Sequence, residues 1–167
     1  ELLDAVRPDA VINAAAYNLV DVAEADPEIA FRINSLAVRN LARASAEAGA
    51  QLVHYSTDYV FDGEKGSPYV EADEPHPLGA YAVSKLAGEF YARAYLADAL
   101  ILRTCGVFGP GGRDTARGNF VETMLRLANS GKPVRVVSDF IASPTYAPAM
   151  ADRTLELVRA GATGIVH

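Results

Sequence analysis

The chain has 167 residues, hydrophobic side chains at 50% of its positions and a formal net charge of −6. This length suits one domain with a substantial core, and the acidic balance without a Lys/Arg block argues against nucleic acid as a partner. The single cysteine, Cys105, excludes a disulfide framework and a cysteine-based zinc site. No apolar run approaches the ~20 residues of a membrane span, so no membrane partner is expected. No secretory signal is visible, which makes the cytoplasm the expected location.

Short apolar strands alternate with helical segments along the chain. The residue pattern predicts strands at 10–13, 51–57, 99–104, 134–137 and 164–167. Helices are predicted at 1–6, 21–26, 27–48, 81–95, 119–128 and 149–160. The long helix after Asp26-Pro27 has a carboxylate cap at its start and Gly49 at its end. Such alternation implies an α/β fold with a mostly parallel sheet and right-handed crossovers.

Several positions carry side chains whose local role stays open. The small residues 14–16 follow the first strand, where they can admit a flat ligand or form a simple turn. Thr57 ends the second strand, at the edge where open α/β sheets hold ligands, and its hydroxyl can bind a substrate oxygen or cap the next turn. Asn34 can be an exposed amide or can hydrogen-bond a strand end or a cofactor. Residues 109–112 can be a bare glycine turn or can line an anion site, and the long loop 62–77 is of a kind that is often functional.

Tyr81 and Lys85 are the clearest candidates for chemistry. Residues four apart lie one above the other on a helix, so the phenol and the ammonium can approach one reacting atom. A free phenol has a pKa near ~10, and a neighbouring positive charge lowers it. We therefore expect Lys85 to lower the pKa of Tyr81 and to make it a general acid or base. The alternative is an ordinary surface pair.

Several runs of residues resemble one family. Tyr-x-x-x-Lys on a helix, after a Ser/Thr at a strand end, resembles the extended short-chain dehydrogenase/reductase superfamily. The run His54-Tyr-Ser-Thr-Asp-Tyr-Val-Phe-Asp-Gly63 is similar to dTDP-4-dehydrorhamnose reductases, as are Tyr81-Ala-Val-Ser-Lys-Leu-Ala-Gly-Glu89 and the Ser143-Pro144-Thr145 turn. The likeness covers nearly the whole chain and implies a doubly wound, Rossmann-like parallel sheet.

The family's Gly-x-x-Gly-x-x-Gly turn is absent from this sequence, so we expect the sheet to be incomplete at the N-terminus. On this resemblance, residues 1–110 form the latter part of an NAD(P)-binding domain. Residues 111–167 supply substrate-binding segments and a returning helix and strand within the same compact unit. Because the chain starts at Glu1 rather than Met, an upstream segment is expected to hold the pyrophosphate cradle and the residue that selects NAD or NADP.

The resemblance implies reduction of the 4-keto group of a nucleotide-diphospho sugar by NADPH or NADH, as in dTDP-rhamnose, deoxysugar and polysaccharide biosynthesis. Tyr81 donates the proton, Thr57 flanks the keto oxygen, and Lys85 holds the nicotinamide ribose. The cofactor-binding residues are Ala14, Ala15, Ala16, Tyr17, Tyr81 and Lys85, with Asn34 behind them. The residues near the substrate are Val20, Thr57, Val60, Phe61 and Asn119, the last near Arg113 and Arg117. No metal is expected, and a homodimer is compatible with the family.

Two departures from the family leave the particular sugar open. Gly106 stands where reductases commonly carry Trp, and Phe140 and Ala142 break the Asp-Gln-x-Gly-x-Pro-Thr turn. A nucleotide-sugar epimerase or dehydratase is the second interpretation, although Tyr59 after Asp58 disfavours a dehydratase, which usually has an acid pair there. The third interpretation is a non-catalytic, nucleotide-binding regulatory subunit on the same fold, which would not need all three catalytic candidates.

Overall fold

The computed structural model describes residues 2–111, 118–131 and 133–167. It divides into two compact units, of which the first comprises Glu1–Thr104 with Gly161–His167 and the second comprises Cys105–Ala160. This division differs from the predicted single unit with a boundary at residue 110, because the last strand of the chain pairs with the sheet of the first unit. The assignment of the two segments to cofactor and substrate stays a prediction.

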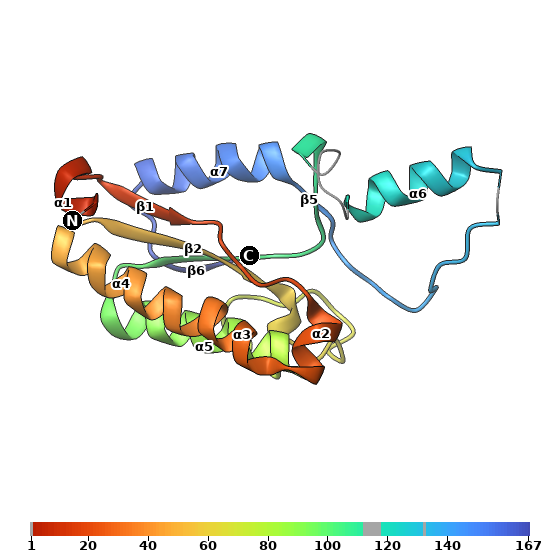
Figure 1. The fold of residues 1–167 in the computed structure, drawn as a ribbon, viewed down its shortest axis with the longest axis horizontal. Coiled ribbons are helices and arrows are strands. Elements are labelled where there is room, and N and C mark those ends of the chain that lie inside the picture. Colours follow the sequence, from red (N-terminus) through yellow and green to blue (C-terminus); the bar gives the residue numbers. More distant parts are fainter. Residues whose placement is uncertain (1, 112–117, 132) are drawn as a thin grey trace. The chain divides into compact units, whose positions relative to one another are not determined.

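The first unit is built on a four-stranded parallel sheet (Figure 1). Its strands, in the spatial order β1-β2-β3-β6, are β1 (Ala10–Asn13), β2 (Gln51–Thr57), β3 (Leu100–Thr104) and β6 (Gly164–Val166). Asn13 lies opposite His54, and Ser56 lies opposite Arg103. All carboxyl ends therefore share one edge of the sheet, and the predicted Rossmann-like, parallel α/β fold is confirmed.

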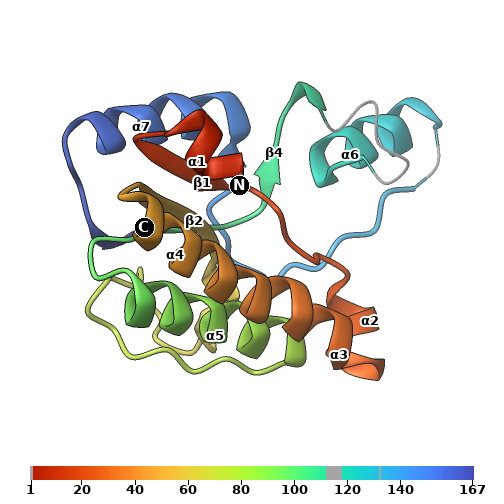
Figure 2. The same cartoon turned by 60° about the vertical axis from the view of Figure 1, so that its left-hand side comes forward.

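Two long helices, α4 (Ala37–Ala48) and α5 (Ala80–Tyr95), pack side by side on one face of this sheet (Figure 1, Figure 2). Their apolar sides form the core with the strands, and the buried members of this core are Val38, Ala42, Leu52, Ala92, Ala99 and Ile101. The shorter helices of the unit are α1 (Leu2–Val6), α2 (Val20–Ala25) and α3 (Pro27–Phe31). Within the part of the chain that the structure describes, no helix has the length and apolarity to cross a membrane.

The helix predicted at 27–48 contains a π-helical turn, η1 (Arg32–Leu36), between α3 and α4. The polar side chains of this turn bond to other elements: Asn34 Nδ2 donates to Ser84 Oγ at 3.0 Å, and Ser35 Oγ donates to the Ser84 carbonyl oxygen at 2.8 Å. The turn thereby fastens to α5. π-Turns inside α-helices are frequent at functional sites, and apolar periodicity does not reveal them.

Helix α5 approaches η1 closely at Gly88. A Cβ atom at this position would lie 2.1 Å from the Asn34 carbonyl oxygen. We expect Gly88→Ala to force the two helices apart and to lower the free energy of unfolding by about 1–3 kcal/mol, the usual effect of overpacking. Urea unfolding of the full-length protein measures this, with Gly111→Ala as control because a Cβ there meets nothing within 4 Å. An unchanged urea midpoint for Gly88→Ala would contradict the close approach.

The second unit contains a two-stranded parallel sheet of β4 (Val107–Phe108) and β5 (Thr145–Tyr146). Its helices are α6 (Phe120–Asn129) and α7 (Ala147–Arg159), close to the predicted positions. The strand predicted at 134–137 is wrong. Among the described residues this segment has no pairing partner, and Val134, Val136 and Val137 are exposed, so the apolar pattern alone does not make a strand.

Candidate functional site

Buried polar side chains gather between the first half of α5 and the carboxyl ends of the strands. They are Asn13, Asn34, Ser35, His54, Ser56, Ser84, Lys85, Glu89 and Arg103. Burying a polar group is unfavourable unless it is hydrogen-bonded, and each of these side chains has at least one such bond. The carboxyl edge of an open α/β sheet is also where ligands bind. We therefore take this layer and the edge above it as the candidate site.

Thr57 lies at the carboxyl end of β2 and is buried. Its hydroxyl oxygen accepts a hydrogen bond from the Tyr59 N–H at 3.2 Å, which caps the one-turn 3-10 helix η2 (Asp58–Val60). The same hydroxyl donates to Asp58 Oδ1 at 3.3 Å, and it lies near enough to Tyr81 to influence the pKa of that phenol. Of the two roles left open for this residue, the structure shows the cap; binding of a substrate oxygen stays a prediction.

Tyr81 occupies the first turn of α5, where it is partly exposed. Its hydroxyl donates to Asn18 Oδ1 at 3.4 Å, and its ring meets the Tyr59 ring edge-on with centroids 6.0 Å apart. Burial raises the pKa of Tyr81 above its ordinary value; the Thr57 hydroxyl, which can donate a hydrogen bond to the ionised phenol, acts in the opposite direction, and the charge of Asp58 adds to the increase. The phenol is therefore neutral at physiological pH.

Lys85 lies one turn after Tyr81 and is only 3% exposed. Its Nζ donates to the main-chain oxygen of Tyr55 at 2.6 Å. Burial lowers the pKa of Lys85 to about 8, and the charge of Glu89 opposes this decrease. The predicted net lowering of the Tyr81 pKa is wrong for this structure: burial of the phenol dominates and raises the pKa, and the Lys85 ammonium is bound to the backbone of β2.

The turn after β1 is held at two points by buried amides. Asn13 Oδ1 accepts a hydrogen bond from the Ala15 N–H at 3.1 Å, and Asn34 Oδ1 accepts one from the Tyr17 N–H at 2.8 Å. Asn34 Nδ2 donates to the Tyr17 carbonyl oxygen at 3.1 Å and to Ser84 Oγ. The Asn34 amide is thus hydrogen-bonded within the protein and positions the turn; its place behind the cofactor stays a prediction. The side chains of the turn are exposed or half-buried: Ala14, Ala15, Ala16 and Tyr17.

The residues predicted to approach the substrate differ in how exposed their side chains are. Val20 begins α2 near this turn and is 36% exposed. Val60 and Phe61 are buried in a cluster with Leu86 and Tyr69, and the Phe61 ring stacks on Tyr69 with centroids 4.2 Å apart. Tyr69 of the 62–77 loop packs against these side chains, and an approach of Val60 and Phe61 to the sugar stays a prediction.

Asn119 belongs to the second unit, where it caps α6. Its Oδ1 accepts a hydrogen bond from the Glu122 N–H at 3.0 Å, and its Nδ2 donates to the Gly109 carbonyl oxygen at 3.1 Å. Arg113 and Arg117, predicted to lie near Asn119, fall outside the described residues, as does Gly112 of the glycine-rich turn. A role of Asn119 toward a diphosphate stays a prediction.

A buried ion pair joins α5 to β3. Arg103 Nη2 donates to Glu89 Oε2 at 2.7 Å, and Arg103 Nε donates to Glu89 Oε1 at 3.0 Å. Ser56 Oγ donates to Glu89 Oε1 at 2.5 Å, so the carboxylate also holds the end of β2 next to Thr57. Arg103 and Ser56 both donate hydrogen bonds to the Glu89 carboxylate, and these bonds fix the position of α5 over the strands.

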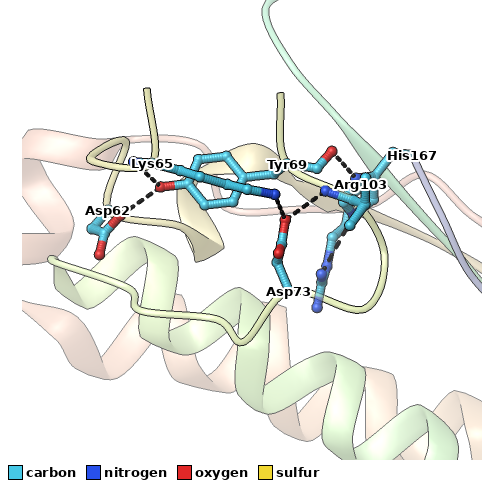
Figure 3. Close-up of polar contacts among 7 residues, drawn as sticks. Asp62, Lys65, Tyr69, Asp73, Arg103 and His167 are labelled. Carbon is cyan, nitrogen blue, oxygen red and sulfur yellow. Dashed lines mark hydrogen bonds and ion pairs between the residues drawn. The ribbon is translucent and has the colours of Figure 1, made fainter. Parts of the chain in front are cut away.

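The 62–77 loop is closed on itself by polar contacts, as Figure 3 shows for Asp62, Lys65, Tyr69 and Asp73. The Tyr69 hydroxyl donates to Asp62 Oδ1 at 2.6 Å, and Lys65 Nζ pairs with Asp73 Oδ2 at 2.5 Å. His167 follows β6. Its Nδ1 lies 3.2 Å from the Tyr69 carbonyl oxygen, and its Nε2 lies 3.5 Å from Nη1 of Arg103. The loop is therefore tied to the carboxyl edge of the sheet.

Sequence reasoning missed three residues that shape the site: Asn13, Asn18 and Glu24. Glu24 of α2 accepts a hydrogen bond from the Ala80 N–H, which anchors the start of α5 beside Tyr81. Glu24 and Ala80 are 56 residues apart in the chain, so no local residue pattern indicates that they are in contact. Among the residues that the structure describes, no group of three or more His, Cys, Asp or Glu could hold a metal ion.

The arrangement combines the neutral phenol of Tyr81, the nearby hydroxyl of Thr57 and a buried ammonium one helical turn away. A phenol with a high pKa can donate a proton to a strongly basic oxygen, and a hydroxyl can orient that oxygen. A buried positive charge stabilises the phenolate that remains. These groups can therefore assist the reduction or oxidation of a carbon–oxygen bond.

Comparison with known proteins bears on this chemistry. The family model described as RmlD substrate binding domain matches residues 1–167. The dTDP-4-dehydrorhamnose reductase of Escherichia coli (strain K12) is 43% identical over 159 residues, which cover 95% of this chain and 52% of that protein. The one from Burkholderia thailandensis is 45% identical over 153 residues, covering 92% of this chain and 50% of that protein.

A solved structure is also similar. The crystal structure of dTDP-4-dehydrorhamnose reductase from Bacillus anthracis str. Ames in complex with NADP superposes with a TM-score of 0.92 at 37% identity, over 99% of this chain and 57% of that chain. This chain thus spans about half the length of the curated relatives that it matches.

Proposed function

Because the chain belongs to the RmlD substrate binding domain family, we propose that the full-length protein reduces the 4-keto group of a nucleotide-diphospho sugar. The observation that carries this proposal is the grouping of Thr57, Tyr81 and Lys85 at the carboxyl edge of the sheet. Relatives that are 43% and 45% identical bear the name dTDP-4-dehydrorhamnose reductase, and their name supports the same class of substrate.

Tyr81 is the proposed proton donor. As the keto carbon is reduced, its oxygen becomes far more basic than a phenolate, so a neutral phenol transfers its proton readily. The raised pKa of Tyr81 suits this direction of reaction, because it keeps the phenol protonated until the alkoxide forms. Thr57, whose hydroxyl influences the pKa of Tyr81, is the proposed hydrogen-bond partner of the same oxygen and orients the carbonyl.

Lys85 supports this step electrostatically. With a pKa of about 8, it is mostly charged at pH 7, and a positive charge one helical turn away favours the Tyr81 phenolate left after proton transfer, against the larger opposing effect of burial. One of its hydrogens is held by the Tyr55 carbonyl oxygen, which leaves two for ligand hydroxyls.

The turn of residues 14–17 fits the flat face of a dinucleotide. Its backbone is fixed by Asn13 and Asn34, and its first side chains are small and exposed. A bound NADPH or NADH would supply the hydride to the carbonyl carbon. The crystal structure of the Bacillus anthracis relative contains NADP, which supports a dinucleotide as the cofactor. We place the reaction in the cytoplasm, in deoxysugar or polysaccharide biosynthesis, with Val20 and Asn119 as substrate contacts.

Cofactor stoichiometry tests the proposal. The full-length protein, given a nucleotide-diphospho-4-keto sugar such as dTDP-4-dehydrorhamnose, is expected to oxidise one NADPH or NADH for each sugar that is reduced, followed by absorbance of the reduced dinucleotide. A sugar nucleotide epimerase or dehydratase recycles its cofactor. Turnover of the sugar without net consumption of reduced dinucleotide would therefore contradict the reductase and indicate one of those alternatives.

The pH dependence of kcat/KM is expected to report Lys85. The charged form is the protonated one, so its contribution is present below a pKa of about 8 and is lost above it. The value of kcat/KM should stay level up to about pH 8 and then fall about tenfold per pH unit, while Tyr81, with its raised pKa, stays protonated. In Lys85→Arg, whose guanidinium stays charged, the fall should move to higher pH. A profile that remains level to about pH 9.5 in the unsubstituted protein would contradict this role.

A further inference from the structure

His54 is a fully buried imidazole in the middle of β2 that the proposed chemistry does not use. It lies opposite Asn13 in the parallel register, and its Nδ1 is 3.1 Å from Asn13 Nδ2. Gly88 of α5 packs over the other side of the ring, where a Cβ would be 3.5 Å from Nε2. The ring is thus enclosed between the neighbouring strand and the helix that carries Tyr81 and Lys85.

The hydrogen bonds determine which nitrogen of His54 carries the proton. The Ala15 N–H donates to Asn13 Oδ1 at 3.1 Å, so the amide group of Asn13 faces His54. An amide NH2 only donates, and Nδ1 must therefore accept with its lone pair. The proton is then on Nε2. Burial, with a smaller contribution from the charge of Lys85, lowers the pKa of His54 to about 3, so the ring stays neutral and able to accept.

His54 Nε2 has no hydrogen-bond partner among the described residues. An unpartnered buried donor is destabilising, and a leucine or phenylalanine at this position would avoid it. The useful atom of the ring is consequently Nδ1. We propose that His54 is a positioning residue for the dinucleotide: it holds the Asn13 amide in the one orientation that binds the Ala15 N–H and so fixes the turn of residues 14–17.

A flipped Asn13 amide would turn its NH2 group toward the Ala15 N–H and would place two donors face to face. With the amide held, the turn is fastened near its start by Asn13 and at Tyr17 by Asn34. A binding surface that is rigid beforehand loses less conformational entropy when its ligand binds. The inference rests on the proposed function, because it takes the ligand of this turn to be a dinucleotide.

The test uses the full-length protein and measures two quantities, the Kd for NADPH by calorimetry and the exchange rate of the Ala15 amide hydrogen. His54→Leu and Asn13→Ala are each expected to raise the Kd about tenfold and to speed exchange at Ala15, while kcat at saturating NADPH changes little. The double variant should have the same Kd for NADPH as Asn13→Ala alone, because both substitutions break the same series of hydrogen bonds from His54 through Asn13 to Ala15. His54→Asn, whose Oδ1 can take the place of Nδ1, should restore most of the affinity.

Ile101→Val is the matched control. Ile101 lies opposite His54 on the other neighbouring strand and is equally buried, so this variant disturbs the core without touching Asn13. It should lower the urea midpoint but leave the Kd unchanged. Additive effects of His54→Leu and Asn13→Ala, or unchanged exchange at Ala15 in His54→Leu, would overturn the proposal. If the unsubstituted protein does not bind NADPH, the proposed function fails, and exchange at Ala15 still decides whether His54 holds the turn.

Discussion

Replacing Tyr81 by phenylalanine is expected to lower kcat of the full-length protein by about 10²–10⁴-fold, the usual contribution of a general acid. The substitution removes only the hydroxyl, which donates to Asn18 Oδ1, and keeps the ring that packs against Tyr59. Affinity for NADPH should be largely retained, because the turn of residues 14–17 and Lys85 are unchanged. Steady-state kinetics and calorimetry on the same preparation measure the two effects separately.

Tyr95→Phe serves as the control for this prediction. Tyr95 ends α5 on its exposed side, and the substitution removes the same atom from the same helix. It should leave kcat unchanged. If Tyr81→Phe turned over sugar as fast as the unsubstituted protein, the proton would have to come from another group and the assignment of Tyr81 would be wrong.

The second large effect is expected on stability, from the buried pair of Glu89 and Arg103. Glu89 and Arg103 are 1% and 6% exposed, so Glu89→Met would leave an uncompensated positive charge in the protein interior. Breaking such a pair typically lowers the free energy of unfolding by about 3–5 kcal/mol. The loss should appear in urea unfolding of the full-length protein. Activity should fall as well, because Glu89 holds Ser56 beside Thr57.

A double substitution distinguishes the unpaired charge from lost packing. Replacing Glu89 and Arg103 together by methionine removes both charges, and the double variant should be more stable than either single variant. Arg153→Ala is the surface control, since its pair with Glu156 is mostly exposed and should contribute little. A double variant less stable than both single variants would contradict the explanation by an unpaired charge.

The secondary structure could be predicted where its determinants are local. The strand at 51–57 is an apolar run, and the helix start at Asp26-Pro27 has its cap in the adjacent residues, with Asp26 Oδ1 accepting from the Glu28 N–H at 3.3 Å. The prediction of a strand at 134–137 failed because a strand also needs a neighbouring strand to pair with, which the residue pattern does not reveal. The π-turn around Asn34 was not predicted for a similar reason: the hydrogen bonds of Asn34 reach Tyr17 and Ser84, which lie far from it along the chain.

The candidate site shows the same limit. Thr57, Tyr81 and Lys85 could be found because their spacing on a strand end and a helix carries the chemistry. The direction in which Lys85 Nζ points could not be predicted, since it depends on the carbonyl oxygen of Tyr55 in the neighbouring strand β2. The burial of Phe61 likewise depends on how the 62–77 loop folds over it. Contacts between distant segments decide such details.

The most direct test of the proposed chemistry is a crystal structure of the full-length protein with NADP and a 4-keto sugar nucleotide. The proposal predicts that the keto oxygen lies about 2.6–3.2 Å from both Tyr81 Oη and Thr57 Oγ1. A sugar bound with its carbonyl turned away from both hydroxyls would contradict it.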